Sequence, residues 1–374
     1  MNLSTRIGAA AAAGAAVAVA AIGLSAAPAF AQSAHETGGG AVFVQTDNTA
    51  GNQVVAYRQA GNGTLAEAGA YPTGGVGGVL AGSVVDHLAS QGSLSYDPRA
   101  GLLFAVNAGS DTVSVFAVYG DRLILRQVTG SGGEFPVSVA VHGDLVYVLN
   151  ALGGGSLQGY RIAGPGLAPL PGSHRSLGLD PDASPQFTNT PGQVAFTPDG
   201  GQLIVTTKAN GDDIDVFGVG RGGWLSRPTV NSEPGTVPFA ITFAAGHVVI
   251  AEAGPNALAS FALAPDGTLT QVSANGTGQT ATCWVAPAGP YLYASNAGSA
   301  SESGFTDSLS LTGTTKTDAG TVDASATPDG RFLYVQAGGA GIVDEFAVGA
   351  GGALTEVGSV TVPGAAGGEG IVAW

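Results

Sequence analysis

The chain has 374 residues, of which 62 are glycine, and its 27 Asp and Glu against 12 Lys and Arg give a formal net charge of −15 at pH 7. A chain this acidic should repel nucleic acids and anionic membranes, so neither is an expected partner of the mature protein. Because hydrophobic residues still make up 44% of the chain, the glycines indicate many tight turns in a folded protein rather than disorder.

The first 31 residues are typical of a signal peptide. Arg6 supplies a positive start, residues 8–23 are small or apolar, and Ala29-Phe30-Ala31 matches a small-x-small cleavage site. We expect a mature chain that begins at Gln32, is secreted or released into a periplasm-like space, and has a net charge of −16 because Arg6 is lost. The alternative is an uncleaved anchor, since the apolar run is about long enough to cross a bilayer.

The rest of the chain repeats one pattern. Its clearest copy is LLFAVNAGSDTVSVFAV at residues 102–118, in which two runs rich in Val and Phe flank a polar loop. This pattern is typical of two β-strands joined by a hairpin. Seven copies begin, in chain order, at Val42, Leu102, Val146, Leu203, Val248, Leu292 and Phe332.

Each copy has two further strands beside it. Upstream lies a strand that ends in a tight turn, such as QVAFTPDGG at Gln193, where Pro fixes φ and Gly accepts a positive φ. Downstream lies a polar strand, such as LTEVGSV at Leu354. Four strands repeated seven times, with a period of about 49 residues, predict an all-β fold, a seven-bladed β-propeller of four-stranded antiparallel blades.

The predicted domain organisation is a signal peptide at 1–31, a short lead-in at 32–40 and a single propeller at 41–374. The first blade lacks its upstream strand, and the chain ends in GEGIVAW, which matches upstream strands elsewhere. We predict that residues 371–374 form the innermost strand of the blade that begins at Ala41, with Trp374 buried at the seam. Closing the ring in this way pairs backbone groups that an open ring would leave unpaired.

Three motifs carry a family resemblance: NAGSDTVSVFAV at Asn107, the PDG turns at Pro198 and Pro328, and APDGTLT at Ala264. With them, the chain resembles the lactonase family of seven-bladed propellers, which includes bacterial 6-phosphogluconolactonase-like proteins and fungal carboxymuconate-cyclising enzymes. The resemblance implies a secreted hydrolase or isomerase that acts on a lactone or related small cyclic acid. No cofactor is expected.

Function in a propeller is expected at the channel mouth, where the longer connections gather. The catalytic candidates there are Lys208, Glu252 and His87. Lys208 and Glu252 end equivalent strands of adjacent blades, so they could meet as a substrate clamp or acid/base pair, or merely as a structural salt bridge. His87 could act as a base near neutral pH, or simply be a solvated loop residue.

Further polar residues are expected at the same mouth. The ligand-binding candidates are Asn107, Asn150, Asn296, Asp323 and Glu369. The three Asn residues have a structural alternative, because an Asn side chain can satisfy backbone groups within its own turn.

The other chemically distinctive residues suggest no site. No metal site is predicted, because the acidic runs Asp180/Asp182 and Asp212/Asp213/Asp215 lack a recognised loop spacing. The lone Cys283 cannot form an internal disulfide, and its apolar surroundings, ATCWVAP, predict a buried inert thiol.

The longest interruption of the repeat is the Pro-rich insertion at residues 169–191. As a connection between two blades, it should lie on the face of the channel mouth. There, His174, Arg175 and Asp182 could cover a ligand as a partial lid. The alternative is an outward loop packed on a blade edge.

The sequence departs from the family at one place. Many members look like Gly-Pro-Arg-His before the innermost strand and Asn-Glu after the next one, whereas this chain has Gly192, Gln193 and Lys208 at the Arg, His and Glu places. Since only Arg binds a phosphate or carboxylate in bidentate geometry, a phosphorylated sugar lactone is not the expected substrate.

Two functions therefore stay open for what we expect to be a monomer with a small-molecule ligand. One is a lactone hydrolase or isomerase. The other is a catalytically inactive propeller that binds a ligand or a protein through its channel mouth.

Overall fold

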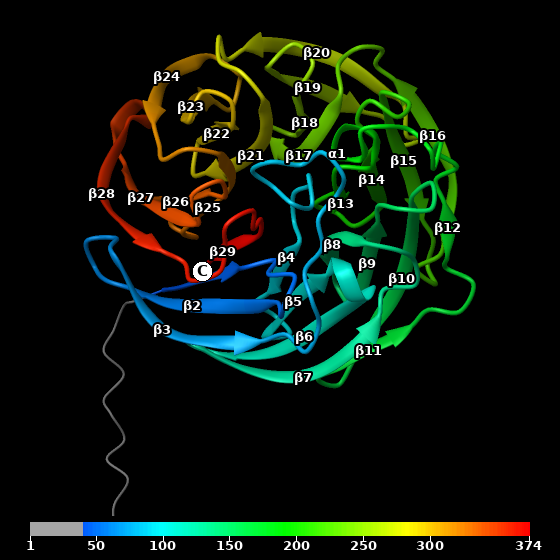
Figure 1. The fold of residues 1–374 in the computed structure, drawn as a ribbon. Coiled ribbons are helices and arrows are strands. Elements are labelled where there is room, and N and C mark those ends of the chain that lie inside the picture. Colours follow the sequence, from blue (N-terminus) through cyan, green and yellow to red (C-terminus); the bar gives the residue numbers. More distant parts are fainter. Residues whose placement is uncertain (1–39) are drawn as a thin grey trace, which may run out of the picture. The chain divides into compact units, whose positions relative to one another are not determined.

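The structure, a computed structural model, describes residues 40–374. These residues form seven β-sheets, arranged as blades around a central channel (Figure 1). The predicted all-β, seven-bladed propeller is thereby confirmed. The predicted signal peptide at 1–31 lies outside the described residues, as do residues 32–39 of the predicted lead-in.

The first four blades, each given from the channel outward, follow the chain. Blade 1 contains β29 (Ile371–Ala373), β1 (Ala41–Gln45), β2 (Gln53–Gln59) and β3 (Leu65–Pro72). Blade 2 contains β4 (Leu94–Asp97), β5 (Leu102–Asn107), β6 (Thr112–Tyr119) and β7 (Arg122–Gly130). Blade 3 contains β8 (Pro136–His142), β9 (Leu145–Asn150), β10 (Ser156–Ala163) and β11 (Gly166–Pro169), and β12 (Arg175–Ser176) also pairs with β10. Blade 4 contains β13 (Val194–Phe196), β14 (Gln202–Thr206), β15 (Asp213–Val219) and β16 (Leu225–Ser232).

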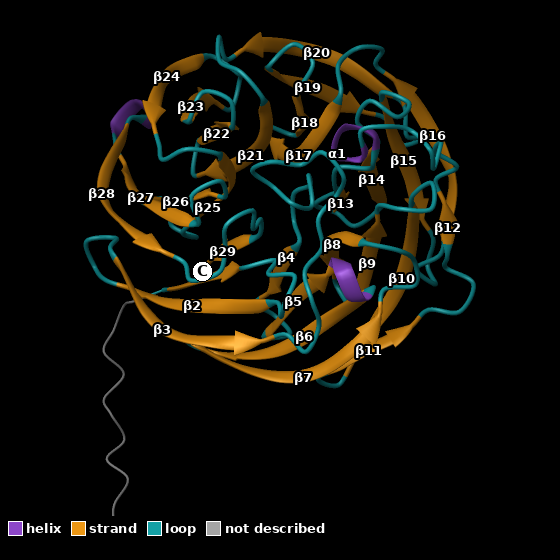
Figure 2. Ribbon diagram, in the orientation of Figure 1, coloured by secondary structure: helices purple, strands orange, loops and turns teal. Residues whose placement is uncertain are grey.

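The last three blades repeat this order. Blade 5 contains β17 (Pro238–Ala244), β18 (His247–Glu252), β19 (Ala257–Leu263) and β20 (Leu269–Gly276). Blade 6 contains β21 (Thr282–Ala288), β22 (Tyr291–Asn296), β23 (Ser301–Thr306) and β24 (Leu311–Lys316). Blade 7 contains β25 (Thr321–Ala326), β26 (Phe332–Ala337), β27 (Ile342–Val348) and β28 (Leu354–Thr361). The described helices are short: α1 (Gln186–Asn189) and the 3₁₀ turns Ala108–Ser110 and Ala350–Gly352 (Figure 2).

Burial explains why the sequence alternates between apolar and polar strands. The second strand of a blade is covered on both faces by neighbouring blades, so all six residues of β5 are buried. The fourth strand forms the rim, and β24 is exposed along almost its whole length. Apolar runs therefore mark the second and third strands, and polar runs mark the fourth.

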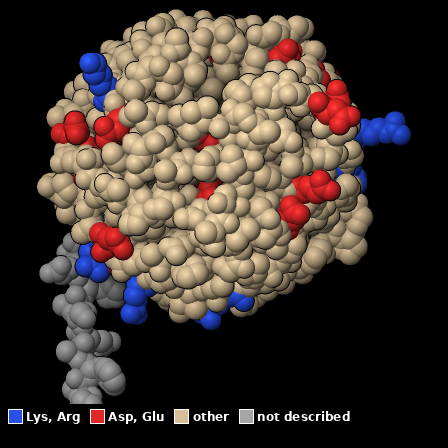
Figure 3. Space-filling model, in the orientation of Figure 1, with Lys and Arg blue, Asp and Glu red and all other residues tan. Residues whose placement is uncertain are grey.

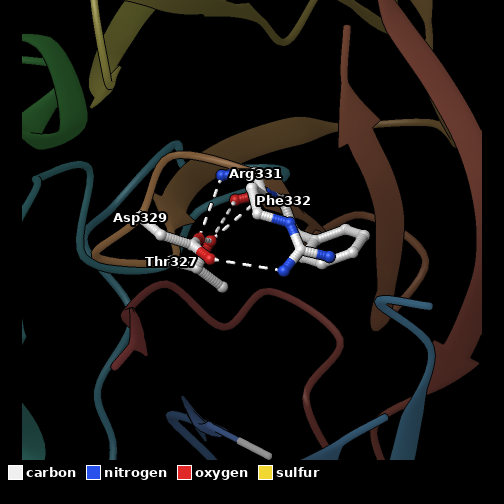
Figure 4. A network of polar contacts seen from close by, with 4 residues as sticks. All are labelled: Thr327, Asp329, Arg331 and Phe332. Atoms are coloured by element: carbon white, nitrogen blue, oxygen red, sulfur yellow. Dashed lines mark hydrogen bonds and ion pairs between the residues drawn. The ribbon is translucent and has the colours of Figure 1, made fainter. Parts of the chain in front are cut away.

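The Pro-Asp-Gly turns at Pro198 and Pro328 join the first and second strands on the face opposite the mouth. In blade 7, the hydroxyl of Thr327 donates to Asp329 Oδ1 at 2.6 Å, and the same oxygen accepts the backbone N–H of Arg331 at 3.1 Å (Figure 4). The backbone N–H of Phe332 donates to Thr327 Oγ1 at 3.1 Å. Blade 4 repeats the Thr–Asp contact, at 2.7 Å, between Thr197 and Asp199. These turns are short and self-satisfied, so the longer connections lie on the other face.

The ring closes as predicted, with the end of the chain in blade 1. β29 pairs with β1 in antiparallel register, with Phe43 opposite Val372. The backbones of Ala41 and Trp374 exchange two hydrogen bonds of 3.0 Å. Trp374 is half-buried rather than fully buried, and its ring lies 5.1 Å from that of Tyr96 in blade 2. The seam is therefore held by backbone pairing and by contact with both neighbouring blades.

Candidate functional site

Two long connections cover the channel mouth. The first, which we call the mouth loop (residues 73–93), joins β3 to β4 and crosses in front of the ring (Figure 1). The second is the insertion at 169–191, whose helix α1 reaches the mouth loop. The backbone N–H of Ala81 donates to Gln186 Oε1 at 2.9 Å, and that of Phe187 donates to the Ala81 carbonyl at 3.4 Å. Segments about 100 residues apart in the sequence therefore meet over the channel.

Beneath these two connections lies a pocket of about 160 Å³, which we call the mouth pocket. Its outer wall contains Asp86 and Ala89 of the mouth loop and Phe187 of α1. Its inner wall contains Lys208, Phe239 and Trp284, from blades 4, 5 and 6. A larger hollow of about 600 Å³ lies on the opposite face, among the short turns of blades 4 and 5. Only the mouth pocket combines a buried charged group with the longer connections, so we take it as the candidate site.

Lys208 is the one predicted catalytic residue that lines the mouth pocket. Its side chain is only 1% exposed, and its Nζ donates to the carbonyl oxygens of Ala89 at 2.6 Å and Phe187 at 2.7 Å, and to Thr190 Oγ1 at 3.2 Å. Burial lowers the pKa of Lys208 to about 7, against the opposing effect of nearby Asp86. All three ammonium hydrogens are thus engaged, and they tie the mouth loop to the insertion.

The predicted meeting of Lys208 and Glu252 is not found among the described residues. Lys208 has a left-handed backbone, with φ of 53°, and its ammonium lies 5.3 Å from the centre of the Phe239 ring. Glu252 ends β18 on the same face, but the described ion pairs do not include it. The expected salt bridge is therefore wrong, because the backbone turn at Lys208 directs its side chain to the two mouth connections.

Glu252 is buried yet unengaged. Its side chain makes no hydrogen bond with any described residue, and burial, followed by the negative charge of Glu233, raises its pKa to about 7. Glu252 itself does not line the mouth pocket. Its chain neighbour Ala253 and the residues on either side of its strand partner Pro238 do, so the Glu252 side chain lies on the other face of blade 5. A carboxyl group with this pKa can exchange protons at neutral pH.

His87 and Asp86 lie side by side in the mouth loop but have different surroundings. His87 is half-buried, packs against Gly367 and has a pKa lowered by burial, and its Nδ1 is buried without a partner among the described residues. Asp86 lines the mouth pocket and accepts backbone N–H groups of Leu88 at 2.8 Å and Ser90 at 2.9 Å. Burial raises the pKa of Asp86 to about 6. The sequence singled out His87, whereas the pocket contains its neighbour.

The three candidate Asn residues are fully buried in their own turns. Asn107 Nδ2 donates to Ser114 Oγ at 2.8 Å, and Asn296 Nδ2 donates to the Ser301 carbonyl at 3.0 Å. Asn150 Nδ2 lies at 3.4 Å from the Ser131 carbonyl. This geometry favours the structural alternative for all three, since a ligand cannot reach them without opening the turn.

Asp323 and Glu369 belong to a group of buried carboxyls in the channel. Glu369 Oε1 accepts the backbone N–H of Gly92 at 2.9 Å, and the backbone N–H of Glu369 donates to Asp47 Oδ2 at 3.0 Å. Burial raises the pKa of Asp47 and Asp323 to about 7, and that of Glu369 well above its usual value. Their partners include backbone groups of the closing strand and the mouth loop, and also the side chains of Gln45 and Ser90. These carboxyls therefore lie at the ring seam. Within residues 40–374, no cluster of side chains is arranged to hold a metal ion.

The distribution of surface charge also matters for which ligands can approach the channel. Acidic atoms are visible near the centre of the face in Figure 3, while the visible Lys and Arg side chains lie towards its periphery. An anion that approached the channel would thus meet negative groups, and the buried Lys208 ammonium is already fully bonded.

The two halves of the insertion at 169–191 have different positions, one on a blade edge and one over the channel mouth. Its first half packs on a blade edge: β12 pairs with β10, and Arg175 Nη2 donates to the Leu225 carbonyl at 3.0 Å. Its second half covers the mouth through Phe187 and Thr190. The predicted lid residues His174, Arg175 and Asp182 do not line the mouth pocket. A lid-like segment exists, but Phe187 and Thr190 form it.

The departure from the family motif has a spatial counterpart. A Cβ atom at Gly192 would lie 2.9 Å from the Phe239 carbonyl oxygen and 3.1 Å from Thr206 Oγ1, so no larger side chain fits there without movement. Gln193 Oε1 accepts the backbone N–H of Ile241 at 2.6 Å. The space that an Arg-His pair would need is filled by contacts between blades 4 and 5.

Sequence reasoning missed the aromatic walls of the pocket. Phe239 and Trp284 stand near the starts of the innermost strands β17 and β21, with ring centres 5.1 Å apart. Cys283 also lines the pocket and is half-buried rather than buried as predicted; desolvation raises the pKa of its thiol to about 12. The available signal was an aromatic residue close to the start of the innermost strand in two consecutive repeats, although the two positions are offset by one residue.

The family described as "Lactonase, 7-bladed beta-propeller" matches residues 77–367. No curated protein matches the chain.

Solved structures match the fold. A candidate 6-phosphogluconolactonase from Bacteroides uniformis has a TM-score of 0.72 at 20% identity, over 90% of this chain and 99% of that one. Another from Bacteroides fragilis has a TM-score of 0.69 at 20% identity, over 90% and 97%. The periplasmic gluconolactonase PpgL of Pseudomonas aeruginosa has a TM-score of 0.69 at 18% identity, over 90% and 99%. At these identities the structural likeness establishes the fold alone.

Proposed function

The chain belongs to the seven-bladed β-propeller lactonase family, and from this premise we propose that it hydrolyses a lactone at the channel mouth, with Glu252 as the general base. The single observation that carries the assignment is the state of Glu252. It is buried at the end of β18, where the next residue, Ala253, lines the mouth pocket; it has no hydrogen-bond partner among the described residues, and its pKa is raised to about 7. General-base catalysis is most effective when the pKa of the base lies near the working pH.

The reaction needs only water and the lactone. The ionised Glu252 carboxylate takes a proton from a water molecule while the water oxygen bonds to the lactone carbonyl carbon. The ring C–O bond then breaks, and the proton passes from Glu252 to the departing ring oxygen. The product is the open-chain hydroxy acid, and the carboxylate is restored.

Lys208 is a positioning residue in this scheme. Its three hydrogen bonds hold the Ala89 and Phe187 carbonyls, and with them the two connections that cover the pocket. Because no ammonium hydrogen is left over, Lys208 does not bind the substrate carbonyl directly.

Substitution of Glu252 tests the proposal. We expect Glu252→Gln to lower kcat/KM for lactone hydrolysis by at least about 100-fold, since the amide cannot accept the proton. In the wild type, kcat/KM should rise as the pH increases through about 7, because only the ionised carboxylate is a base. Hydrolysis is followed by acid release at constant pH. Glu356→Gln, on the exposed outer strand β28, is the matched control and should leave kcat/KM unchanged. An unchanged rate in Glu252→Gln would remove Glu252 from the mechanism.

We also propose that the protein acts outside the cytoplasm. The support is the signal-like sequence at 1–31 and the similarity in fold to a periplasmic gluconolactonase. No helix within residues 40–374 is long and apolar enough to cross a membrane. The protein recovered from the exported fraction should have Gln32 as its first residue in N-terminal sequencing. A cell-bound protein that retains Met1 would favour the anchor instead.

A further inference from the structure

We infer that the mouth pocket binds the uncharged aryl ring of a small aromatic lactone. The evidence is that the pocket has aromatic walls and that its charged groups are already paired. The ester part of this inference rests on the proposed function, whereas the binding of the ring does not.

The shape of the pocket fits one aromatic ring. Phe239 and Trp284 meet at 62° in an edge-to-face pair, and Phe187 closes the opposite side. Trp284 Nε1 donates to the Ser90 carbonyl at 2.7 Å, so its polar edge is satisfied. A volume of about 160 Å³ is close to that of apolar cavities of about 150 Å³ that accept benzene. A fused lactone ring would then extend from the pocket towards the mouth.

The polar groups around the pocket are already satisfied. The Lys208 ammonium has three acceptors, and the Asp86 carboxylate oxygens have backbone N–H donors. The charges of Lys208 and Asp86 oppose each other across the pocket wall. A phosphate or carboxylate placed here would lose its water and gain no free partner, which is costly. The pocket therefore selects against anionic and hydroxyl-rich ligands.

The entrance of the pocket is apolar. Val84 lines the pocket although it is 83% exposed, so an apolar side chain stands at the entrance. Val237 and Ala281, which also line the pocket, have left-handed φ values of 50° and 55°. The same conformation stands directly before the innermost strand of blades 3, 7 and 1, at Phe135, Gly320 and Gly370, so it belongs to the propeller repeat.

Access to the pocket depends on the two connections that Lys208 ties together. The mouth loop and α1 touch through Ala81, Gln186 and Phe187, and Lys208 holds both from beneath. A ring can enter past Val84 without breaking any buried strand pairing. Phe187 is thus the wall supplied by the insertion, and Phe239 and Trp284 are the walls supplied by the blades.

The test uses 1-indanone, a neutral bicyclic ketone that has the shape of a benzo-fused lactone but no ester bond. Isothermal titration calorimetry on the mature protein should give saturable binding, with a Kd on the order of 0.1 mM and a negative heat-capacity change. Glucono-δ-lactone should bind at least about 100-fold more weakly. Ala253→Leu, which fills the pocket, should weaken 1-indanone binding at least about 10-fold, and Phe187→Ala should weaken it through loss of a wall.

The matched control is Ala262→Leu, an exposed position on β19 of the same blade, which should leave the Kd unchanged. Thermal melting of each variant confirms that it is folded. Absence of saturable binding, or equal Kd values in Ala253→Leu and Ala262→Leu, would overturn the inference. Binding of 1-indanone without hydrolysis of any lactone would leave the pocket assignment standing and refute the proposed function. Hydrolysis that Ala253→Leu does not affect would do the reverse.

Discussion

Deletion of residues 370–374 is expected to destabilise the whole propeller, by several kcal/mol out of a total that is rarely above about 15 kcal/mol for a folded protein. The deletion removes β29, the innermost strand of blade 1, and with it the pairing of Phe43 with Val372. It also removes Ile371 from a core cluster shared by blades 1 and 7, and exposes the inner edge of β1. The C-terminal strand would then no longer link blade 1 to blade 7 and close the ring.

Thermal unfolding of the mature protein measures this effect. We expect the deletion variant to melt at least about 10 °C below the wild type, or to fail to accumulate in soluble form. Trp374→Phe is the control, because it keeps the strand pairing and the backbone hydrogen bonds with Ala41 while changing the contact with Tyr96. It should melt within a few degrees of the wild type. A deletion variant that melts at the wild-type temperature would contradict ring closure by β29.

The stability of the protein should fall as the pH rises from about 5 to about 7. The buried carboxyls Asp47 and Asp323 have pKa values raised to about 7 by desolvation, and the pKa of Glu369 is raised further by the neighbouring acidic groups. Between their unfolded pKa values, near 4, and these folded values, the native state binds more protons than the unfolded state. Linkage then requires the free energy of unfolding to decrease with pH across this interval.

Glu369→Gln isolates this effect. The amide keeps an acceptor for the backbone N–H of Gly92 but cannot ionise, so the variant should melt higher than the wild type above pH 7 and depend less on pH. Lys208 has the opposite effect on the pH dependence. Because its pKa in the folded protein is lowered to about 7, it makes the free energy of unfolding increase with pH, but only above pH 7. The exposed Glu356→Gln is the control and should follow the wild type. A melting temperature that is constant or rises from pH 5 to pH 7 would show that these carboxyls are already ionised in the folded protein at pH 5, so that their pKa values are not raised.

The propeller could be predicted because it is periodic. Seven copies of one apolar–polar pattern place 28 strands without any knowledge of tertiary contacts, and the unmatched end GEGIVAW could fill only the missing inner strand of the first blade. Turn chemistry added the rest, since Pro-Asp-Gly allows few backbone paths. Local patterns were sufficient wherever local interactions determine the structure.

The site could be predicted only in part, because loops and backbone dihedrals determine it. Lys208 and Glu252 were correctly placed on one face, but the left-handed backbone at Lys208 sends its side chain away from Glu252. No periodic pattern records that residues near 85 and 187 meet over strands near 239 and 284. The insertion shows the same limit: Arg175 finds a backbone carbonyl on blade 4, and Phe187, an unremarked residue of a polar stretch, covers the pocket.

The buried carboxyls show the same limit: the sequence pattern predicts where they lie, but tertiary packing determines their partners. Asp323 and Glu369 were expected to face a ligand, yet their described partners are backbone groups at the seam and in the mouth loop, together with the hydroxyl of Ser90. Glu252, by contrast, is buried without such partners. Which acidic residue is free for chemistry follows from its hydrogen-bond partners, and these are fixed only when the ring is assembled.

The most direct test of the account is the rate at which the mature protein hydrolyses two lactones of opposite character. Phthalide is neutral and aromatic, while 6-phosphogluconolactone is anionic and hydroxyl-rich. We predict that kcat/KM for phthalide exceeds that for 6-phosphogluconolactone by at least about 100-fold, and that Glu252→Gln abolishes the difference. A preference for the phosphorylated sugar lactone would contradict the assigned pocket, and hydrolysis of neither lactone above the spontaneous rate would contradict the catalytic role of the channel mouth.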